Sequence, residues 1–125
     1  MHCTAVGKAI LSTLPENEVL HILESKGMPQ YTPNTITAPE KLLVNLSEIR
    51  KSKISVEEEE NEIGIICLGT PVFDYSGRAI GAISVSGPAS RMQEKGIARI
   101  GEELKRAGEQ ISANMGFNYY RSPEK

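Results

Sequence analysis

The sequence of 125 residues predicts a fold of the α/β (α+β) class. Two observations lead to this prediction. Residues 64–87 contain two apolar segments on either side of a turn at 74–77, which is the pattern of a β-hairpin. The segments before and after the hairpin have the end signals and apolar spacing of helices. The expected order is helix, helix, loop, helix, strand, hairpin, helix.

Three helices are expected before the hairpin. Residues 4–14 form a short helix with Thr4 near its N-cap. The second helix starts at Pro15 and ends at Gly27, and four of its residues are expected to face inward: Val19, Leu20, Ile22 and Leu23. The third helix starts at a capping box, Thr37-Ala-Pro-Glu40. Its apolar residues recur at helical spacing: Leu42, Leu43, Leu46 and Ile49.

The first helix carries a glycine, Gly7, in its first turn, where glycine costs about 1 kcal/mol relative to alanine. Such a glycine suggests that another backbone or a ligand comes close. Unpaired amides at a helix start can bind an anion. Ordinary packing of the helix against a strand explains the glycine equally well, so both interpretations stay open.

A short strand at 54–56 leads into an acidic segment at 57–62, which holds five carboxylates in six positions. Divalent cations need ligands spaced as in the EF-hand loop, and this segment lacks that spacing. We therefore expect a solvated loop, with one or two of its acids turned inward.

The first arm of the hairpin is apolar on both side-chain parities, which is typical of a central strand covered on both faces. Pro71 predicts a bulge or a sheet edge near it. In the second arm Ser84 and Ser86 share one parity, opposite to Ile83 and Val85. The two serines either form a solvated face or line a small polar cavity together with Cys67. Parity does not give the register between strands, so both interpretations stay open.

After the hairpin, Ser90-Arg-Met-Gln93 predicts a second capping box that opens the longest helix. This helix carries a stripe at three- and four-residue spacing: Ile97, Ile100, Leu104, Ala107, Ile111 and Met115. Gly116 ends it, and residues 117–125 are expected to form a loosely held C-terminal tail.

Composition argues against several classes of protein. A net charge of -2 lacks the basic footprint of a duplex binder, and 5% aromatic residues argue against base stacking. No apolar run approaches the ~20 residues that span a bilayer, and no signal peptide is recognisable, so a cytoplasmic location without membrane contact is expected. Cys3 and Cys67 are expected to be free thiols. The two histidines and two cysteines lack ligand spacing, so no metal site and no cofactor is expected.

Five segments, collinear from Met1 to about Gly116, resemble the effector-binding domain of the IclR family of bacterial transcriptional regulators. They are Met1-His-Cys-Thr-Ala-Val-Gly-Lys-Ala9, Thr35-Ile-Thr37, the acidic run through Cys67, Pro71-Val-Phe-Asp74 and Ala82-Ile-Ser-Val-Ser-Gly-Pro88. The resemblance implies a GAF- or profilin-like fold, a curved antiparallel sheet flanked by helices. It also implies that residues 1–116 are an N-terminally truncated effector-binding domain that lacks the leading strands and the winged helix-turn-helix.

The resemblance further implies a function. Such a domain binds a small carboxylate effector, forms a homodimer or homotetramer, and reaches DNA only through the absent N-terminal domain. Carried over residue by residue, the effector-binding positions are Ala5, Val6, Glu57, Cys67, Ser84 and Ser86. Amides and hydroxyls would donate hydrogen bonds to the effector's carboxylate. Glu57 is longer than the Asp usual at its position, which favours a smaller or differently held effector.

Two other functions compete with a ligand sensor. A hydrolytic enzyme would use Cys67 or Ser84 as nucleophile, but the chain offers only His2 and His21 as bases, and Ser84 lacks a Gly-x-Ser-x-Gly elbow. No catalytic residue is therefore expected. An oligomerisation module with a vestigial pocket is the other alternative. The open sheet edge left by the missing strands is expected to meet another copy of the chain or to be a weak spot.

Overall fold

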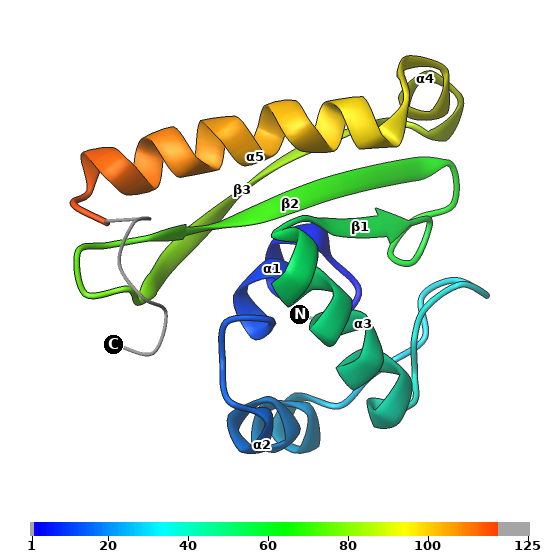
Figure 1. Ribbon diagram of the computed structural model, residues 1–125. Coiled ribbons are helices and arrows are strands. Elements are labelled where there is room, and N and C mark those ends of the chain that lie inside the picture. Colours follow the sequence, from blue (N-terminus) through cyan, green and yellow to red (C-terminus); the bar gives the residue numbers. More distant parts are fainter. Residues whose placement is uncertain (1, 118–125) are drawn as a thin grey trace.

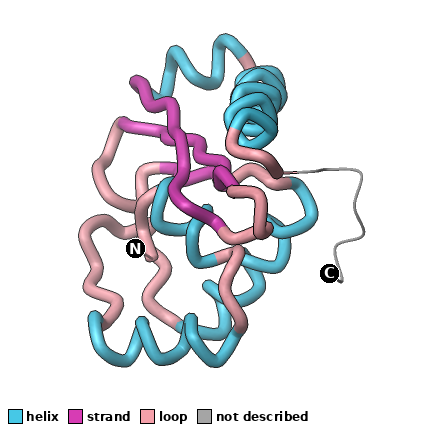
Figure 2. Tube along the Cα trace, turned by 90° about the vertical axis from the view of Figure 1, so that its left-hand side faces the viewer, coloured by secondary structure: helices cyan, strands magenta, loops and turns pink. Residues whose placement is uncertain are grey.

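The computed structural model describes residues 2–117. Its elements are α1 (Ala5–Leu11), α2 (Glu16–Lys26), α3 (Pro39–Ser52), β1 (Ser55–Glu58), β2 (Ile65–Phe73), β3 (Ala79–Pro88), α4 (Ala89–Lys95) and α5 (Ile97–Asn114). The α/β class is confirmed. α5 runs along one face of the sheet, and α1, α2 and α3 gather beneath the other (Figure 1). The strands form a layer between these two groups of helices (Figure 2).

The sheet is antiparallel with the strand order β1-β2-β3, so β2 is central as its two-sided apolar pattern predicts. One parity of β2, with Ile66 and Leu68, faces α4 and α5. The other parity, with Gly69, faces α1. The register of β2 with β3 shifts between Val72 and Phe73. The irregularity expected near Pro71 is thus a bulge, and a sheet edge there is ruled out because Pro71 lies in the central strand.

Each face of the sheet has its own apolar core. On the α1 side the buried core residues come from the three N-terminal helices: Leu11, Val19, Leu23, Leu42, Leu46 and Ile49. On the other side Ile66, Leu68 and Met92 are buried against α5. The helical spacing of α2 and α3 therefore predicts most of the first core correctly. Leu20 is the exception, because its side chain is 40% exposed.

α5 approaches the sheet through small residues. Gly101, Gly108 and Ser112 are buried, and the Ser112 hydroxyl accepts a hydrogen bond of 2.9 Å from the Phe73 amide. A Cβ atom on Gly108 would lie 2.6 Å from Cγ2 of Thr70. Because these small residues face the sheet, the large apolar residues beside them on the helix point partly away from it.

The predicted stripe of α5 is consequently only half right. Its first members, Ile97, Ile100 and Leu104, pack partly buried against the second core. Ile111 and Met115 are 38% and 48% exposed. The small residues Gly101, Gly108 and Ser112 contact the sheet instead. A glycine lets the helix and strand backbones come closer than a leucine or isoleucine would.

Both predicted capping boxes are wrong. α3 has Ala38 as its N-cap, without a side-chain cap bond. Proline disfavours a helical residue before it, so the helix starts at Pro39, and Thr37 lies one position too early to cap it. Ser90 does not open the longest helix either, because Gly96, with φ of 91°, separates α4 from α5.

β3 has β2 on one side only, so an open edge is present in the described part of the sheet. Ile80 and Val85 of this strand are 49% and 36% exposed. That a second copy covers the edge stays a prediction. Phe117 stacks on Phe73 with ring centroids 5.1 Å apart, and the rest of the predicted tail, 118–125, lies outside the described residues. Within residues 2–117, no helix is long and apolar enough to cross a membrane.

The close approach of α5 predicts opposite effects of the same substitution at two glycines. Gly108→Ala places a methyl group against Thr70, whose hydroxyl is held by the Lys53 carbonyl at 2.7 Å, and should lower the free energy of unfolding by about 1–3 kcal/mol. Gly101→Ala meets only ordinary contacts at 3.5 Å or more and should raise it by about 0.5–1 kcal/mol. Urea unfolding measures both, and equal effects at the two positions would contradict this packing.

Candidate functional site

A row of polar side chains crosses the sheet on the face toward α1. The strand register pairs Glu57 with Cys67 and Cys67 with Ser86. The next row on the same face contains Ser55, Gly69 and Ser84. Four of the six predicted site residues therefore share one face. Ser84 and Ser86 are solvent-exposed, and Ser86 lies opposite the partly buried Cys67.

The first turn of α1 rests directly on the second row. A Cβ atom on Gly69 would lie 2.7 Å from the Ala5 carbonyl oxygen. The Ser55 hydroxyl donates a hydrogen bond of 2.6 Å to that same oxygen. Only a glycine at 69 allows this contact, because any Cβ atom there would collide with the backbone of α1.

The two remaining predicted residues, Ala5 and Val6, lie in that first turn of α1. Ala5 is buried, whereas Val6 is 39% exposed. The Thr4 hydroxyl caps the Gly7 amide at 3.0 Å, as the sequence predicts. In an α-helix the amides before that position have no intrahelical acceptor, so those of Ala5 and Val6 remain able to donate. Of the six predicted positions, four thus share one sheet face and Ala5 contacts that face through its carbonyl, whereas Val6 follows Ala5 with an exposed side chain.

Glu57 is the buried acid of the row, with only 3% of its surface exposed. One of its oxygens accepts a hydrogen bond of 2.8 Å from the Glu60 amide. Burial raises the pKa of this carboxyl above its ordinary value. Burial, followed by the charge of Glu57, also raises the pKa of the Cys67 thiol. The expectation that one or two acids of the segment turn inward is confirmed by Glu57 and Glu60.

Sequence reasoning missed Lys8, which is fully buried in α1. Its ammonium lies 2.7 Å and 2.6 Å from the two carboxylate oxygens of Glu60. Lysine side chains are normally solvated, so the residue type does not predict that Lys8 is buried. The available signal was its position, three residues after Ala5 and three before Leu11, on the buried face of the helix.

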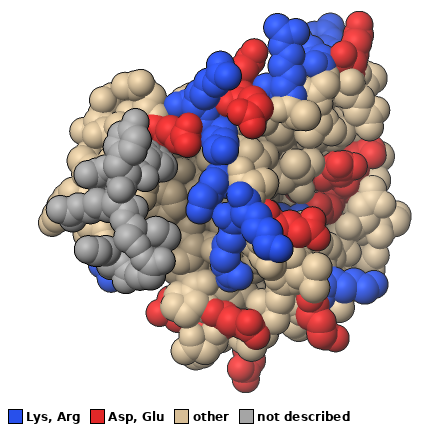
Figure 3. Space-filling view, viewed as in Figure 1, with Lys and Arg blue, Asp and Glu red and all other residues tan. Residues whose placement is uncertain are grey.

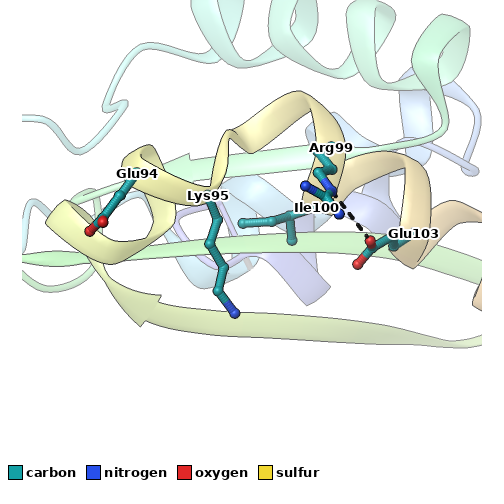
Figure 4. A pocket seen from close by; sticks show the side chains of 5 residues that line it. All are labelled: Glu94, Lys95, Arg99, Ile100 and Glu103. Carbon is teal, nitrogen blue, oxygen red and sulfur yellow. Dashed lines mark ion pairs between the residues drawn. The ribbon is translucent and has the colours of Figure 1, made fainter.

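Two surface depressions lie apart from this site. One is lined by Glu94, Lys95, Arg99, Ile100 and Glu103 of α4 and α5, on the far side of the sheet (Figure 4). Its Arg99–Glu103 pair is 3.7 Å apart and well exposed, so it contributes little. The other contains Lys51, Lys53 and Lys105, where basic side chains gather between α3 and α5 (Figure 3). Neither includes a predicted site residue.

Among the described residues, those that could act in catalysis or bind a metal ion are the two histidines, Cys67 and the acidic side chains. The His2 ring contacts the Pro29 carbonyl at 2.9 Å, and His21 is exposed on α2. The raised pKa of Cys67 keeps its thiol protonated at neutral pH, which is unfavourable for a nucleophile. Within residues 2–117, no three His, Cys, Asp or Glu side chains are grouped to hold a metal ion.

The raised pKa of Glu57 predicts a specific pH dependence of stability. Since the folded pKa exceeds the unfolded one, the associated stability is full below the unfolded pKa and is lost as the pH rises through the folded pKa. Glu57→Gln keeps an acceptor for the Glu60 amide and removes the charge. Its stability relative to the wild type should therefore increase with pH in this window, by up to about 1.4 kcal/mol per pH unit.

Urea unfolding at several pH values measures the difference. Glu58→Gln is the control, because Glu58 is exposed on the same strand. If the two variants differed from the wild type by the same amount at every pH, burial of the Glu57 charge would be contradicted.

Comparison with known proteins assigns the fold to a family. Residues 1–113 match the family described as bacterial transcriptional regulator IclR C-terminal. The HTH-type transcriptional repressor AllR of Escherichia coli (strain K12) is 34% identical over 117 residues, which are 94% of this chain and 43% of AllR. The chain therefore spans less than half the length of this relative.

Solved structures agree with this assignment. The Thermotoga maritima IclR structure superimposes with a TM-score of 0.86 and 41% identity, covering 93% of this chain and 47% of that one. A double mutant of the PobR inducer-binding domain from Acinetobacter, in complex with 3-hydroxybenzoic acid, gives a TM-score of 0.82 and 28% identity, covering 89% of this chain and 66% of that one. This chain belongs to the IclR family of bacterial transcriptional regulators and corresponds to the C-terminal domain of those proteins.

Proposed function

We propose that the chain is a ligand-sensing domain that binds a small organic acid between the first turn of α1 and the sheet. The row formed by Glu57, Cys67 and Ser86, next to the row on which that turn rests, is the observation that carries the proposal. Ser84 and Ser86 hydroxyls and the amides of Ala5 and Val6 are the donors for the effector's carboxylate. The bound aromatic acid in the related PobR domain supports an acid as the effector class.

Glu57 sets the electrostatics of this proposed site. A carboxylate bound beside an ionised Glu57 would meet a like charge in a partly dehydrated place, which is costly. The raised pKa of Glu57 lowers this cost, because its neutral form becomes accessible. Binding of an anionic effector then takes up a proton at Glu57. A protonated Glu57 can also donate a hydrogen bond to the effector.

In this proposal the domain is part of a longer protein, and effector binding changes the arrangement of that protein's subunits. An effector shifts the balance between two arrangements only if it binds them with different affinity. We assign that role to a homodimer or homotetramer, in which DNA is bound by an N-terminal winged helix-turn-helix and not by this domain. The domain itself performs no catalysis in this proposal, because burial and then the charge of Glu57 raise the pKa of the Cys67 thiol and disfavour the thiolate that a nucleophile needs.

A second candidate function is an oligomerisation module whose site is vestigial. The open edge of β3 and the exposed Ile80, Ile111 and Met115 favour it. Exposed apolar side chains mark protein contacts where they form a contiguous patch. This candidate predicts a stable oligomer whose melting is insensitive to any organic acid.

A thermal melting series tests the sensor proposal. Glyoxylate, pyruvate, keto-deoxy sugar acids and 3-hydroxybenzoate are added in excess to the full chain. An acid at a hundredfold excess over its Kd stabilises the folded state by about 2.7 kcal/mol, which raises the Tm of a domain this size by several degrees. The Ser84→Ala/Ser86→Ala double variant should lose most of this shift.

The control for that variant is Ser47→Ala/Ser90→Ala, which changes two exposed serines away from this face. An equal loss in both double variants would contradict the proposed site. A chain that melts cooperatively and responds to none of the acids would favour the oligomerisation module.

The affinity for an anionic effector should also depend on pH. Because binding favours protonated Glu57, the affinity should fall by up to about tenfold per pH unit as the pH rises through the raised pKa. Glu57→Gln should flatten this dependence. Calorimetric titration across pH, in buffers of different ionisation enthalpy, measures both affinity and proton uptake, and a wild-type affinity that is constant with pH would contradict the role given to Glu57.

A further inference from the structure

We propose that Lys8 is a positioning residue of the effector site, and that its buried ion pair with Glu60 holds Glu57 in place in the polar row beside the first turn of α1. The inference rests on the proposed function, because it concerns the same site. Lys8 belongs to α1 and Glu60 to the acidic segment, and their ion pair joins these two parts of the chain.

On the helix side, two contacts fix α1. The carbonyl of Ala5 accepts the hydrogen bond from Ser55, and one turn later the ammonium of Lys8 contacts both oxygens of Glu60. Lys8 has no exposed surface. A buried ion pair adds little net stability compared with an apolar pair of the same volume, because both charges lose their water. Its clearest consequence is geometric, since the pair requires one relative position of helix and segment.

On the side of the acidic segment, a hydrogen bond links Glu60 to Glu57. The Glu60 amide donates to the Glu57 carboxyl at 2.8 Å, so the direction of that carboxyl depends on where Glu60 lies. The hydroxyl of Thr35 donates to the Glu60 carbonyl, and that of Thr32 donates to the Glu59 carbonyl at 2.5 Å. The ion pair is thus the contact through which α1 acts on a segment that Thr32 and Thr35 of the loop before α3 also hold.

The charges around Glu57 agree with this role. Burial raises the pKa of Glu57, the charge of Glu60 raises it further, and a hydrogen bond with the Cys67 side chain lowers it. Burial and the charge of Glu57 raise the pKa of the Cys3 thiol. Lys8 neutralises Glu60, so that two buried carboxylates do not face each other without compensation. Lys8 therefore acts on Glu57 through Glu60, whose charge raises the pKa of Glu57 in addition to the larger effect of burial.

The decisive variant is Lys8→Met/Glu60→Met, which replaces both charges by apolar side chains of similar length and keeps the backbone amide of position 60. The matched control is Arg99→Met/Glu103→Met, which removes the exposed ion pair of α5. Three quantities are measured on the full chain: the free energy of unfolding in urea, the pKa of Glu57 by carboxyl ¹³C NMR without ligand, and the affinities for glyoxylate, pyruvate and 3-hydroxybenzoate.

The proposal expects the double variant to unfold cooperatively with a Glu57 pKa shifted toward its ordinary value. It also expects at least a tenfold loss of affinity for the acid that binds the wild type. The control variant should leave both quantities unchanged. A folded double variant with the wild-type Glu57 pKa and wild-type affinity would overturn the proposal.

Two further arms keep the test decisive. If the double variant does not fold, Glu60→Asp takes its place, because it keeps both charges but shortens one partner by a methylene group. It should shift the Glu57 pKa with little loss of stability, and an unshifted pKa would overturn the proposal. If none of the acids binds the wild type, the proposed function fails. The NMR measurement on Glu60→Asp, which keeps the charge of position 60, still decides whether the ion pair positions Glu57.

Discussion

The structure depends on one close contact, the approach of α1 to the sheet at Gly69. Because this residue lacks a Cβ atom, the carbonyl of Ala5 can lie where a side chain would otherwise be, and Ser55 donates a hydrogen bond to it. The contact places the first turn of α1 above the polar rows of the sheet. It also directs the remainder of α1 toward the core shared with α2 and α3, where Leu11 is fully buried. A larger residue at 69 would separate the helix from the sheet and open both the core and the site.

The site combines exposed donors with a buried acid. Ser84 and Ser86 are accessible to a ligand, whereas Glu57 is enclosed and has a raised pKa. In the proposed function, a small acid would enter from the β3 side and Glu57 would lie at its inner end. Stability and binding are then linked, because the burial that makes Glu57 responsive to an anion also destabilises the domain at neutral pH. The family to which the chain belongs consists of transcriptional regulators.

Much of the fold could be predicted because local patterns determine it. Apolar spacing identified the helices, and two-sided apolarity identified β2 as central. The register between strands could not be predicted, since parity orders side chains within one strand only. The face shared by Glu57, Cys67 and Ser86 therefore came from the structure. The buried charge of Lys8 was missed because its partner Glu60 is 52 residues away. The stripe of α5 was misjudged because small residues can displace large ones at a close helix–sheet contact.

The central claim is that an acid binds between α1 and the polar rows of the sheet. An NMR titration of the ¹⁵N-labelled full chain with pyruvate, glyoxylate and 3-hydroxybenzoate tests it most directly, because each backbone amide reports separately. The account predicts that the largest saturable shifts occur at the amides of Ala5, Val6, Cys67 and Ser86. Shifts confined to the depression lined by Lys95 and Arg99, or to the groove lined by Lys51 and Lys105, would contradict it.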